Sequence, residues 1–136
     1  MRVFLDTNVL VSAVATRGLC ADVLREVLTS HQLVLSTHLV SELETVMLTK
    51  FIAPQALISD FVSVLTRDAI VIREATLTAI DIKDQDDILI LSTALNGGAE
   101  LVVTGDKELL ALREVQTLRI MSPREFWELL KAQFPD

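Results

Sequence analysis

Short apolar runs alternate with longer segments of helical periodicity along almost the whole chain. The runs that we predict as buried strands are residues 3–5, 33–35, 70–72, 101–103 and 118–120. Strands this short and apolar, separated by helices, are typical of a parallel sheet that is covered on both faces. The sequence therefore predicts an α/β fold with a four- or five-stranded parallel sheet, whose crossover connections are right-handed.

Helix signals fill the intervals between these runs. The predicted helices cover residues 7–18, 21–29, 37–50, 86–96 and 106–112, and two more begin at Pro54 and Pro123. Gly97 and Gly98 follow helix 86–96, as glycines often do at a helix end. Ser122 and the later Glu125 form a capping box for the last helix. In a sheet of this kind, ligands bind at the carboxyl ends of the strands.

The length of the chain indicates how many domains it has, and its charge restricts the classes of function. A chain of 136 residues predicts a single domain, residues 1–136. The formal net charge of −7 argues against a general nucleic-acid-binding surface, which should be basic. It does not exclude a nuclease whose acids are clustered in one metal site, because bound cations reverse the local charge. A basic partner protein is a second way to balance the charge.

Cysteine usage and hydropathy indicate the compartment. Cys20 is the single cysteine, so no internal disulfide can form, and no spacing of Cys and His indicates a zinc site. No apolar run approaches the roughly 18 residues that a membrane-spanning helix needs. These features fit a reducing cytoplasm, and we expect a cytoplasmic protein.

Two aspartates follow predicted strands directly. Asp6 comes after residues 3–5, and Asp106 comes two residues after 101–103. Both are therefore expected at the carboxyl edge of the sheet, where a ligand would bind. The alternative role is helix capping, because Asp is a favoured N-cap residue. For Asp106 the two roles are equally plausible, whereas Thr7 or Asn8 could cap the helix in place of Asp6.

Three further aspartates crowd the start of helix 86–96. Asp87 falls among the apolar side chains of this helix, on the inward face. A carboxylate there is poorly explained as a solvated charge. Asp86 lies further round the helix and Asp84 precedes it, so capping and solvation explain these two better than a direct metal role.

Helix 37–50 carries two glutamates, Glu42 and Glu44. They flank the apolar stripe of that helix on opposite sides, and periodicity does not choose between them. We nevertheless expect acids from four separate segments to converge on one edge of the sheet. Carboxylates at this density suit Mg²⁺ or Mn²⁺, which can activate water for attack on a phosphodiester. Neither His31 nor His38 is given a catalytic role, and His38 is expected on the surface.

Three blocks of sequence, in this order and at this chain length, resemble the PIN-domain family from end to end. Val3–Asn8 resembles the opening strand with its Asp-Thr-Asn motif, Asp87–Ala94 resembles the acid-led helix, and Leu101–Asp106 resembles the strand that ends in Thr-x-Asp. The runs Asp84–Asp87 and Asp106–Leu110 are similar to a bacterial and archaeal subgroup of toxin components.

This resemblance implies a three-layer α/β/α fold, a divalent cation (Mg²⁺ or Mn²⁺) and cleavage of RNA. It also implies a homodimer and a small antitoxin that places an Arg or Lys in the acidic pocket. The acids that it assigns to catalysis and to the metal are Asp6, Glu42, Asp87 and Asp106. Asn8 and Thr104 match positions that orient these acids by hydrogen bonding. Asp84 or Asp86 could share the role of Asp87.

Three other functions compete with this one. A haloacid-dehalogenase-type phosphatase would place a second Asp where this chain has Asn8. A phosphate-receiver domain would need an Asp after the third strand, where Arg73 and Glu74 stand. An inactive PIN-like module would hold RNA or a protein without cutting RNA. Because all four acids are present, the sequence favours an active ribonuclease, and binding of Mg²⁺ or Mn²⁺ would separate the two.

Overall fold

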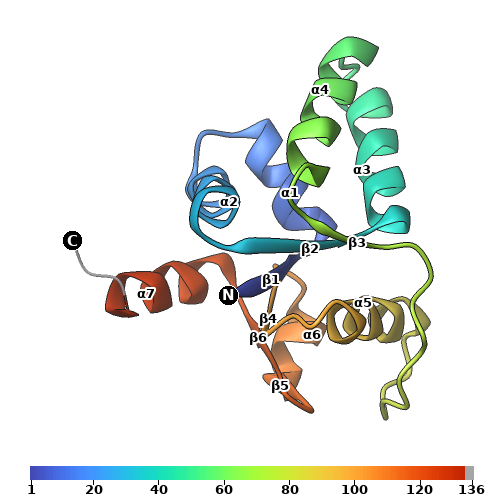
Figure 1. The fold of residues 1–136 in the computed structure, drawn as a ribbon, viewed down its shortest axis with the longest axis vertical. Helices are drawn as coiled ribbons and strands as arrows, with labels where there is room; N and C mark the ends of the chain where they lie inside the picture. Colours follow the sequence, from blue (N-terminus) through green and yellow to red (C-terminus); the bar gives the residue numbers. More distant parts are fainter. Residues whose placement is uncertain (134–136) are drawn as a thin grey trace.

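A central β-sheet organises the molecule, whose computed structural model describes residues 1–133 (Figure 1). Its strands are β1 (Arg2–Leu5), β2 (Gln32–Ser36), β3 (Ile70–Ile72), β4 (Leu101–Val103), β5 (Glu114–Val115) and β6 (Leu118–Met121). They lie in the order β3-β2-β1-β4-β6-β5. All neighbouring strands run parallel except β5, which pairs antiparallel with β6.

The parallel sheet confirms the predicted architecture, but the predicted count of four or five strands misses one. The five predicted runs are all strands, and β5 is a sixth, at the edge of the sheet. It has two residues and lies between Arg113 and Gln116, whose φ angles of 61° and 55° turn the chain sharply. A strand of two residues carries no alternation of polar and apolar side chains, so periodicity could not reveal it.

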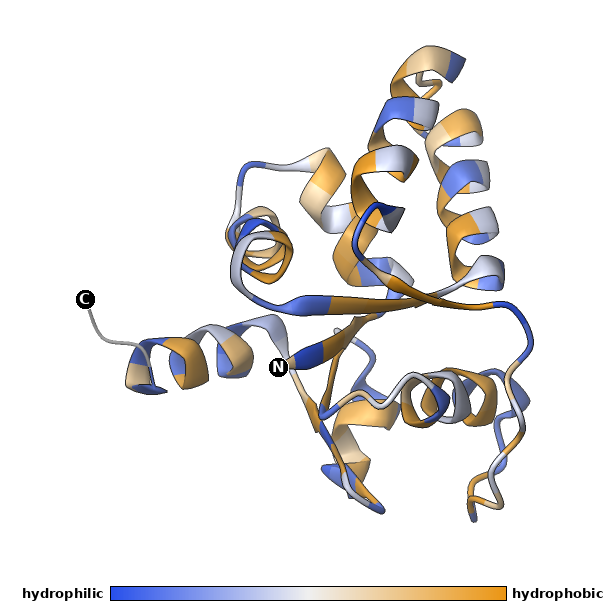
Figure 2. Cartoon of the chain, viewed as in Figure 1, coloured by the Kyte–Doolittle hydropathy of each residue, from blue (hydrophilic) through white to orange (hydrophobic). Residues whose placement is uncertain are grey.

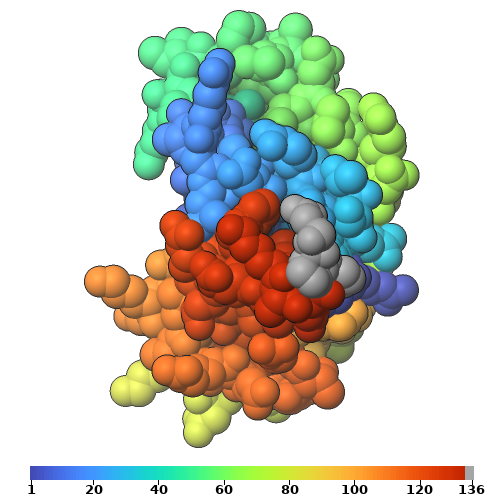
Figure 3. All heavy atoms as spheres, turned by 90° about the vertical axis from the view of Figure 1, so that its left-hand side faces the viewer, coloured from blue at the N-terminus to red at the C-terminus, as the bar shows by residue number. Residues whose placement is uncertain are grey.

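Helices cover both faces of the sheet (Figure 1). They are α1 (Thr7–Ala15), α2 (Leu19–Ser30), α3 (Thr37–Thr49), α4 (Gln55–Thr66), α5 (Gln85–Asn96), α6 (Lys107–Leu112) and α7 (Pro123–Gln133). Helices α1 to α4 lie on one side and α5 and α6 on the other, while α7 packs beside α2 (Figures 1 and 3). The chain is therefore wound in opposite directions from β1, which creates a crevice between β1 and β4.

The first predicted helix ends earlier than expected. Residues 7–18 were expected to form one helix, but α1 ends at Ala15, and Thr16 is its extended C-cap. In residues 1–133 no single helix is long and apolar enough to cross a membrane. Only α1 and α2 taken together, with a bend of 109° between them, reach the required length and composition.

The central strands form the core and are hydrophobic along most of their length (Figure 2). The side chains of Val3, Phe4 and Leu5 in β1 are almost completely buried. Helix α5 ends so close to β2 that a Cβ atom at Gly97 would collide with the side chain of Val34. This close approach fixes the position of the helix that carries Asp87.

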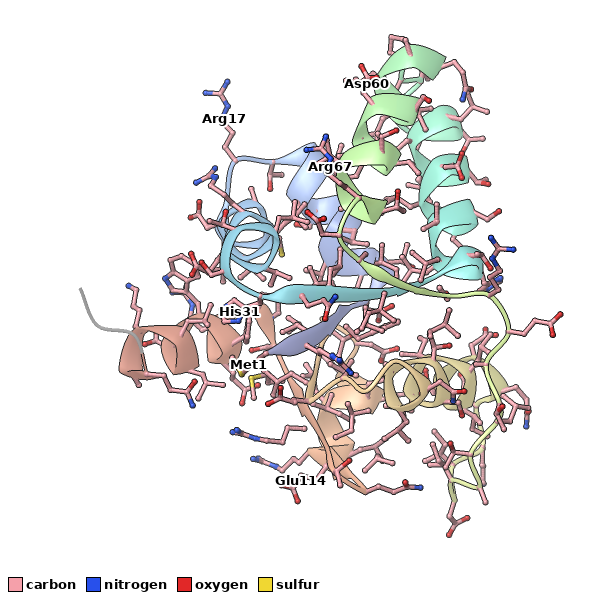
Figure 4. The ribbon with its side chains drawn as sticks, in the orientation of Figure 1. Met1, Arg17, His31, Asp60, Arg67 and Glu114 are labelled. Carbon is pink, nitrogen blue, oxygen red and sulfur yellow. The ribbon has the colours of Figure 1, made fainter. Side chains whose placement is uncertain are left out.

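The amino ends of the strands lie away from the acids. Met1 and His31 lie there side by side (Figure 4), with the Met1 amino group 3.2 Å from Nδ1 of His31. The rings of His31 and Phe126 make an edge-type contact with 6.4 Å between their centroids. His31 is therefore at the opposite edge of the sheet from Asp6 and Asp106, and its place is structural.

Candidate active site

A cleft of about 370 Å³ opens at the carboxyl edge of the parallel strands, between α3 and α5. Its lining residues are Phe4, Asp6, Thr7, Asn8, Ser36, His38, Leu39, Glu42, Asp84, Asp86, Asp87, Leu89, Ile90, Thr93 and Asp106. All the acids predicted from the sequence are in this set, whereas Glu44 is not. Among the described residues, no Lys or Arg lines the cleft, so its wall is strongly negative.

Asp6 is held rigidly at the centre of this edge. It is 6% exposed and is the N-cap of α1, because its Oδ1 accepts a hydrogen bond of 2.8 Å from the Thr7 amide. Its Oδ2 accepts from Thr104 Oγ1 at 2.8 Å and from Asn8 Nδ2 at 3.2 Å. Burial raises the pKa of Asp6, these hydrogen bonds lower it, and the nearby charge of Asp106 raises it again. The net effect is a raised pKa.

Thr104 and Asn8 tie the ends of β1 and β4 together. The buried Thr104 hydroxyl donates to Asp6 and accepts from the Asp106 amide at 3.0 Å, so one side chain orients both acids. Asn8 donates to Asp6 and accepts from the Gly105 amide at 3.1 Å. These contacts are of the kind that the sequence resemblance implies for Asn8 and Thr104.

Thr104→Val should disturb the site without changing its shape much. The buried Asp6 carboxylate loses one of its three donors and the Asp106 amide loses its side-chain acceptor, which should destabilise the fold by about 1–3 kcal/mol. The Thr104 hydrogen bond lowers the pKa of Asp6, so its loss should raise that pKa further. Urea denaturation and an NMR titration of the Asp6 carboxylate measure the two effects. Unchanged stability together with an unchanged pKa would show that Thr104 does not hold Asp6.

Asp87 is the least compensated acid of the cluster. It is 8% exposed, in the first turn of α5, and within residues 1–133 no side chain donates a hydrogen bond to its carboxylate. Burial, followed by the charges of Asp84, Asp106, Glu108 and Asp6, raises its pKa to about 6. A buried carboxylate surrounded by other carboxylates is unfavourable unless a cation is present.

Glu108 belongs to this cluster, although the sequence analysis did not select it. One carboxylate oxygen from each of Asp84, Asp87 and Glu108 lies within 4.8 Å of the other two. Glu108 stands in the first turn of α6, two residues after Asp106, and its amide donates to Asp106 Oδ1 at 2.9 Å. The spacing could have revealed Glu108, because a side chain in the first helical turn after Asp106 stays close to the carboxyl edge of the sheet.

Capping and clustering are not alternatives here, because several acids do both. Asp84 Oδ1 accepts from the amides of Asp86 and Asp87 at 2.8 and 3.3 Å, and Asp106 is the N-cap of α6. Asp84 and Asp106 each use Oδ1 for the cap, which leaves Oδ2 available for a cation. Asp86 is exposed and lines the cleft at its rim.

Glu42 lies on the opposite wall from the cluster. Its Oε1 is 3.3 Å from Nε2 of His38, one helical turn earlier, and both side chains are more than half exposed. His38 was expected on the surface, but it also lines the cleft. It comes two residues after the end of β2, so the rule that placed the acids at the carboxyl edge also applies to this histidine.

The donor set of the cleft fits a hard divalent cation. Asp84, Asp87 and Glu108 offer three carboxylate oxygens at short mutual distances, and Asp6 and Asp106 add their charge to the same group. Such oxygens are the ligands that Mg²⁺ and Mn²⁺ prefer. Sulfur ligands are absent among the lining residues, and the one imidazole is paired with Glu42.

A model of the PIN domain family matches residues 2–108. The chain belongs to the PIN-domain family. The matched range contains every acid of the cluster, from Asp6 to Glu108. This membership decides against the phosphatase and receiver alternatives, which the residues at positions 8, 73 and 74 already disfavoured.

A solved structure shows the same fold as this PIN domain. It is a chain of the VapBC2 complex from Rickettsia felis, bound to a DNA fragment from its promoter. The two chains are 16% identical and superpose with a TM-score of 0.60, over 90% of this chain and 98% of the other. A search of curated proteins gave no match. The structural similarity confirms the α/β/α fold that the sequence predicted.

Proposed function

We propose that this PIN domain is a Mg²⁺- or Mn²⁺-dependent endoribonuclease and the toxin of a toxin–antitoxin pair. The observation that carries the proposal is the Asp87 carboxylate. The Asp87 residue is 8% exposed, its carboxylate lines the cleft with no hydrogen-bond donor among the described residues, and four other acids lie close to it. Such an arrangement costs stability in the free protein, and a bound cation removes that cost. Membership of a family of nucleases supports the same function.

The residues of the site have separate roles in this proposal. Asp87, Asp84 and Glu108 hold the cation, together with Asp6 and Asp106. When bound, the cation supplies a water of lowered pKa and neutralises charge on the phosphodiester. Thr104 and Asn8 keep Asp6 in one orientation, so that little rearrangement is needed when the substrate binds. Glu42 faces the cluster across the cleft and adds a further carboxylate to the site from the opposite wall.

Metal binding should stabilise the fold strongly. A cation that binds only the folded state stabilises it by mass action, by about 2.7 kcal/mol when its concentration is one hundred times its Kd. We expect a higher melting temperature with millimolar Mn²⁺ than with chelator, and a smaller increase for Asp87→Asn. Differential scanning fluorimetry measures both. An identical melting temperature in Mn²⁺ and in chelator would contradict the metal site.

A small antitoxin is the partner that we propose for this site. The net charge of −7 and the absence of Lys and Arg from the described lining of the cleft favour a partner that brings a basic side chain. The similar chain from Rickettsia felis belongs to a VapBC2 complex, which supports a partner of this kind. An Arg or Lys of the antitoxin would occupy the position of the cation and block cleavage.

We also propose that the protein is a homodimer. Several apolar side chains at the α3–α4 end are exposed, and burial against a second copy would remove them from water. These are Leu48, Phe51, Ile52 and Leu57, of which Ile52 is 83% exposed. Light scattering should report a dimer that Ile52→Lys weakens. A monomer at every concentration would contradict this proposal without affecting the metal site.

A further inference from the structure

A second hollow adjoins the cleft at the acids. It has a volume of about 440 Å³, and its lining residues are Asn8, Val9, Ser12, Cys20, Gly105, Asp106 and Pro123. Asn8 and Asp106 line both the cleft and this hollow. The two therefore adjoin at Asn8 and Asp106, beside Asp6, and we call the second one the side hollow.

The cleft and the side hollow together follow the carboxyl edge of the sheet. Ser36, the last residue of β2, lines the cleft at one end, and Pro123, just after β6, lines the side hollow at the other. Between β2 and β6 lie β1 and β4, which carry the acids. Three strand spacings make this path about 14 Å long, which exceeds the step of about 3.4 Å between stacked nucleotides.

The chemistry of the side hollow differs from that of the cleft. Its lining has one charged side chain, Asp106, at the boundary, and otherwise small polar and apolar groups. Gly105 leaves the space open, because a Cβ there would meet only Asn8, at 3.6 Å. Such a surface suits a base or a sugar better than a phosphate. The exposed residues Lys107 and Arg124 directly follow Asp106 and Pro123 in the chain, where they can reach backbone phosphates at the rim.

We propose that the side hollow is a subsite for a nucleotide of single-stranded RNA, next to the phosphate that is cut. The strand would enter through the cleft, pass the acids between Asp6 and Asp106, and place its following nucleotide against Ser12 and Cys20. A strand that continues on both sides of the acids is cut internally. This inference rests on the proposed ribonuclease function and adds the place of the substrate to it.

A first test fills the side hollow. Ser12→Trp should lower kcat/KM for single-stranded RNA by roughly tenfold or more, since one stacked or buried base contributes about 1–3 kcal/mol of binding. Ser30→Trp, which adds the same bulk at the exposed amino edge of the sheet, is the matched control and should cleave like the wild type. Both variants should keep the rise in melting temperature with Mn²⁺, which shows that the fold and the metal site are intact. Wild-type kcat/KM in a folded Ser12→Trp variant would overturn the subsite.

A second test uses the wild-type chain and does not depend on a substitution. Cys20 is the single cysteine and is half-buried in the side hollow, so iodoacetamide reports on this place alone. RNA at a concentration that saturates cleavage should slow its alkylation severalfold. The control is the double variant Cys20→Ser, Ser30→Cys, which moves the thiol to the exposed amino edge, where RNA should have no effect.

The outcomes separate the two proposals. If the wild type cleaves RNA and the alkylation rate of Cys20 is the same with and without RNA, the subsite is wrong and the ribonuclease function stands. If the wild type cleaves no RNA with either metal, both proposals fail. If a basic antitoxin peptide protects Cys20 and RNA does not, the side hollow is a protein-binding surface, and the nucleotide subsite is equally overturned.

Discussion

Asp6→Asn should reduce metal-dependent RNA cleavage by about a thousandfold. Asp6 directly follows the central strand β1, is only 6% exposed, and is fixed at the edge of the cleft by Thr104 and Asn8. An amide keeps the size of the side chain but removes the negative charge that attracts the cation. The loss of several kcal/mol of metal-centred stabilisation of the transition state corresponds to this reduction in rate.

The fold of this variant should be retained, because the raised pKa of Asp6 shows that its charge is not favoured in the folded chain. The Asn oxygen can still accept from the Thr7 amide and cap α1. The assay compares single-stranded RNA cleavage with Mg²⁺ or Mn²⁺, with circular dichroism to follow folding. Glu44→Gln is the matched control, because Glu44 does not line the cleft, and it should cleave like the wild type. Cleavage by Asp6→Asn at the wild-type rate would contradict the nuclease function.

Asp87→Asn should stabilise the metal-free protein at neutral pH and make its stability less dependent on pH. The folded-state pKa of about 6 lies above the ordinary 3.8, so the folded chain binds the proton more tightly than the unfolded chain. Stability from this group is therefore full below pH 3.8 and is lost as the pH rises through about 6. The gap corresponds to at most about 3 kcal/mol, which solvent in the cleft screens in part, and Asn, which carries no charge, avoids this loss.

Divalent metal should reverse the order of stability, so that the wild type becomes more stable than Asp87→Asn. With saturating Mn²⁺ at pH 7.5 the wild type gains stability, whereas Asp87→Asn has lost a buried ligand and should gain much less. Urea denaturation at pH 4, 6 and 7.5, in chelator and in Mn²⁺, gives the free energies of unfolding for this comparison. A metal-free Asp87→Asn variant that is less stable than the wild type at pH 7.5 would show that the Asp87 charge is compensated in the fold.

The fold was predictable because the information lies in short, local patterns. Each of the five parallel strands is an apolar run between helices, and the strand ends of a doubly wound sheet meet at one edge. Asp6 and Asp106 could therefore be placed from their positions after strands. Asp87 could be placed because it lies among apolar residues on its helix, where a charge needs a specific reason.

The parts that escaped prediction depend on contacts between distant segments. Glu108 is an ordinary first-turn acid in the sequence, and its neighbours Asp84 and Asp87 come from another helix. His38 resembles a surface residue until α3 is placed beside the cleft. The end of α1 at Ala15 lies three residues before Gly18, because Thr16 already adopts an extended conformation. A single sequence does not show any of these placements.

Cleavage of single-stranded RNA by the wild-type chain, with and without divalent metal, tests the central claim most directly. The purified chain is incubated with a pool of varied RNAs in Mg²⁺, in Mn²⁺ and in chelator, and the products are separated on a denaturing gel. We predict internal cleavage with metal, none in chelator, and recovery when metal is added in excess of the chelator. Equal cleavage in chelator, or metal-dependent RNA binding with no cleavage of any RNA in the pool, would contradict the account.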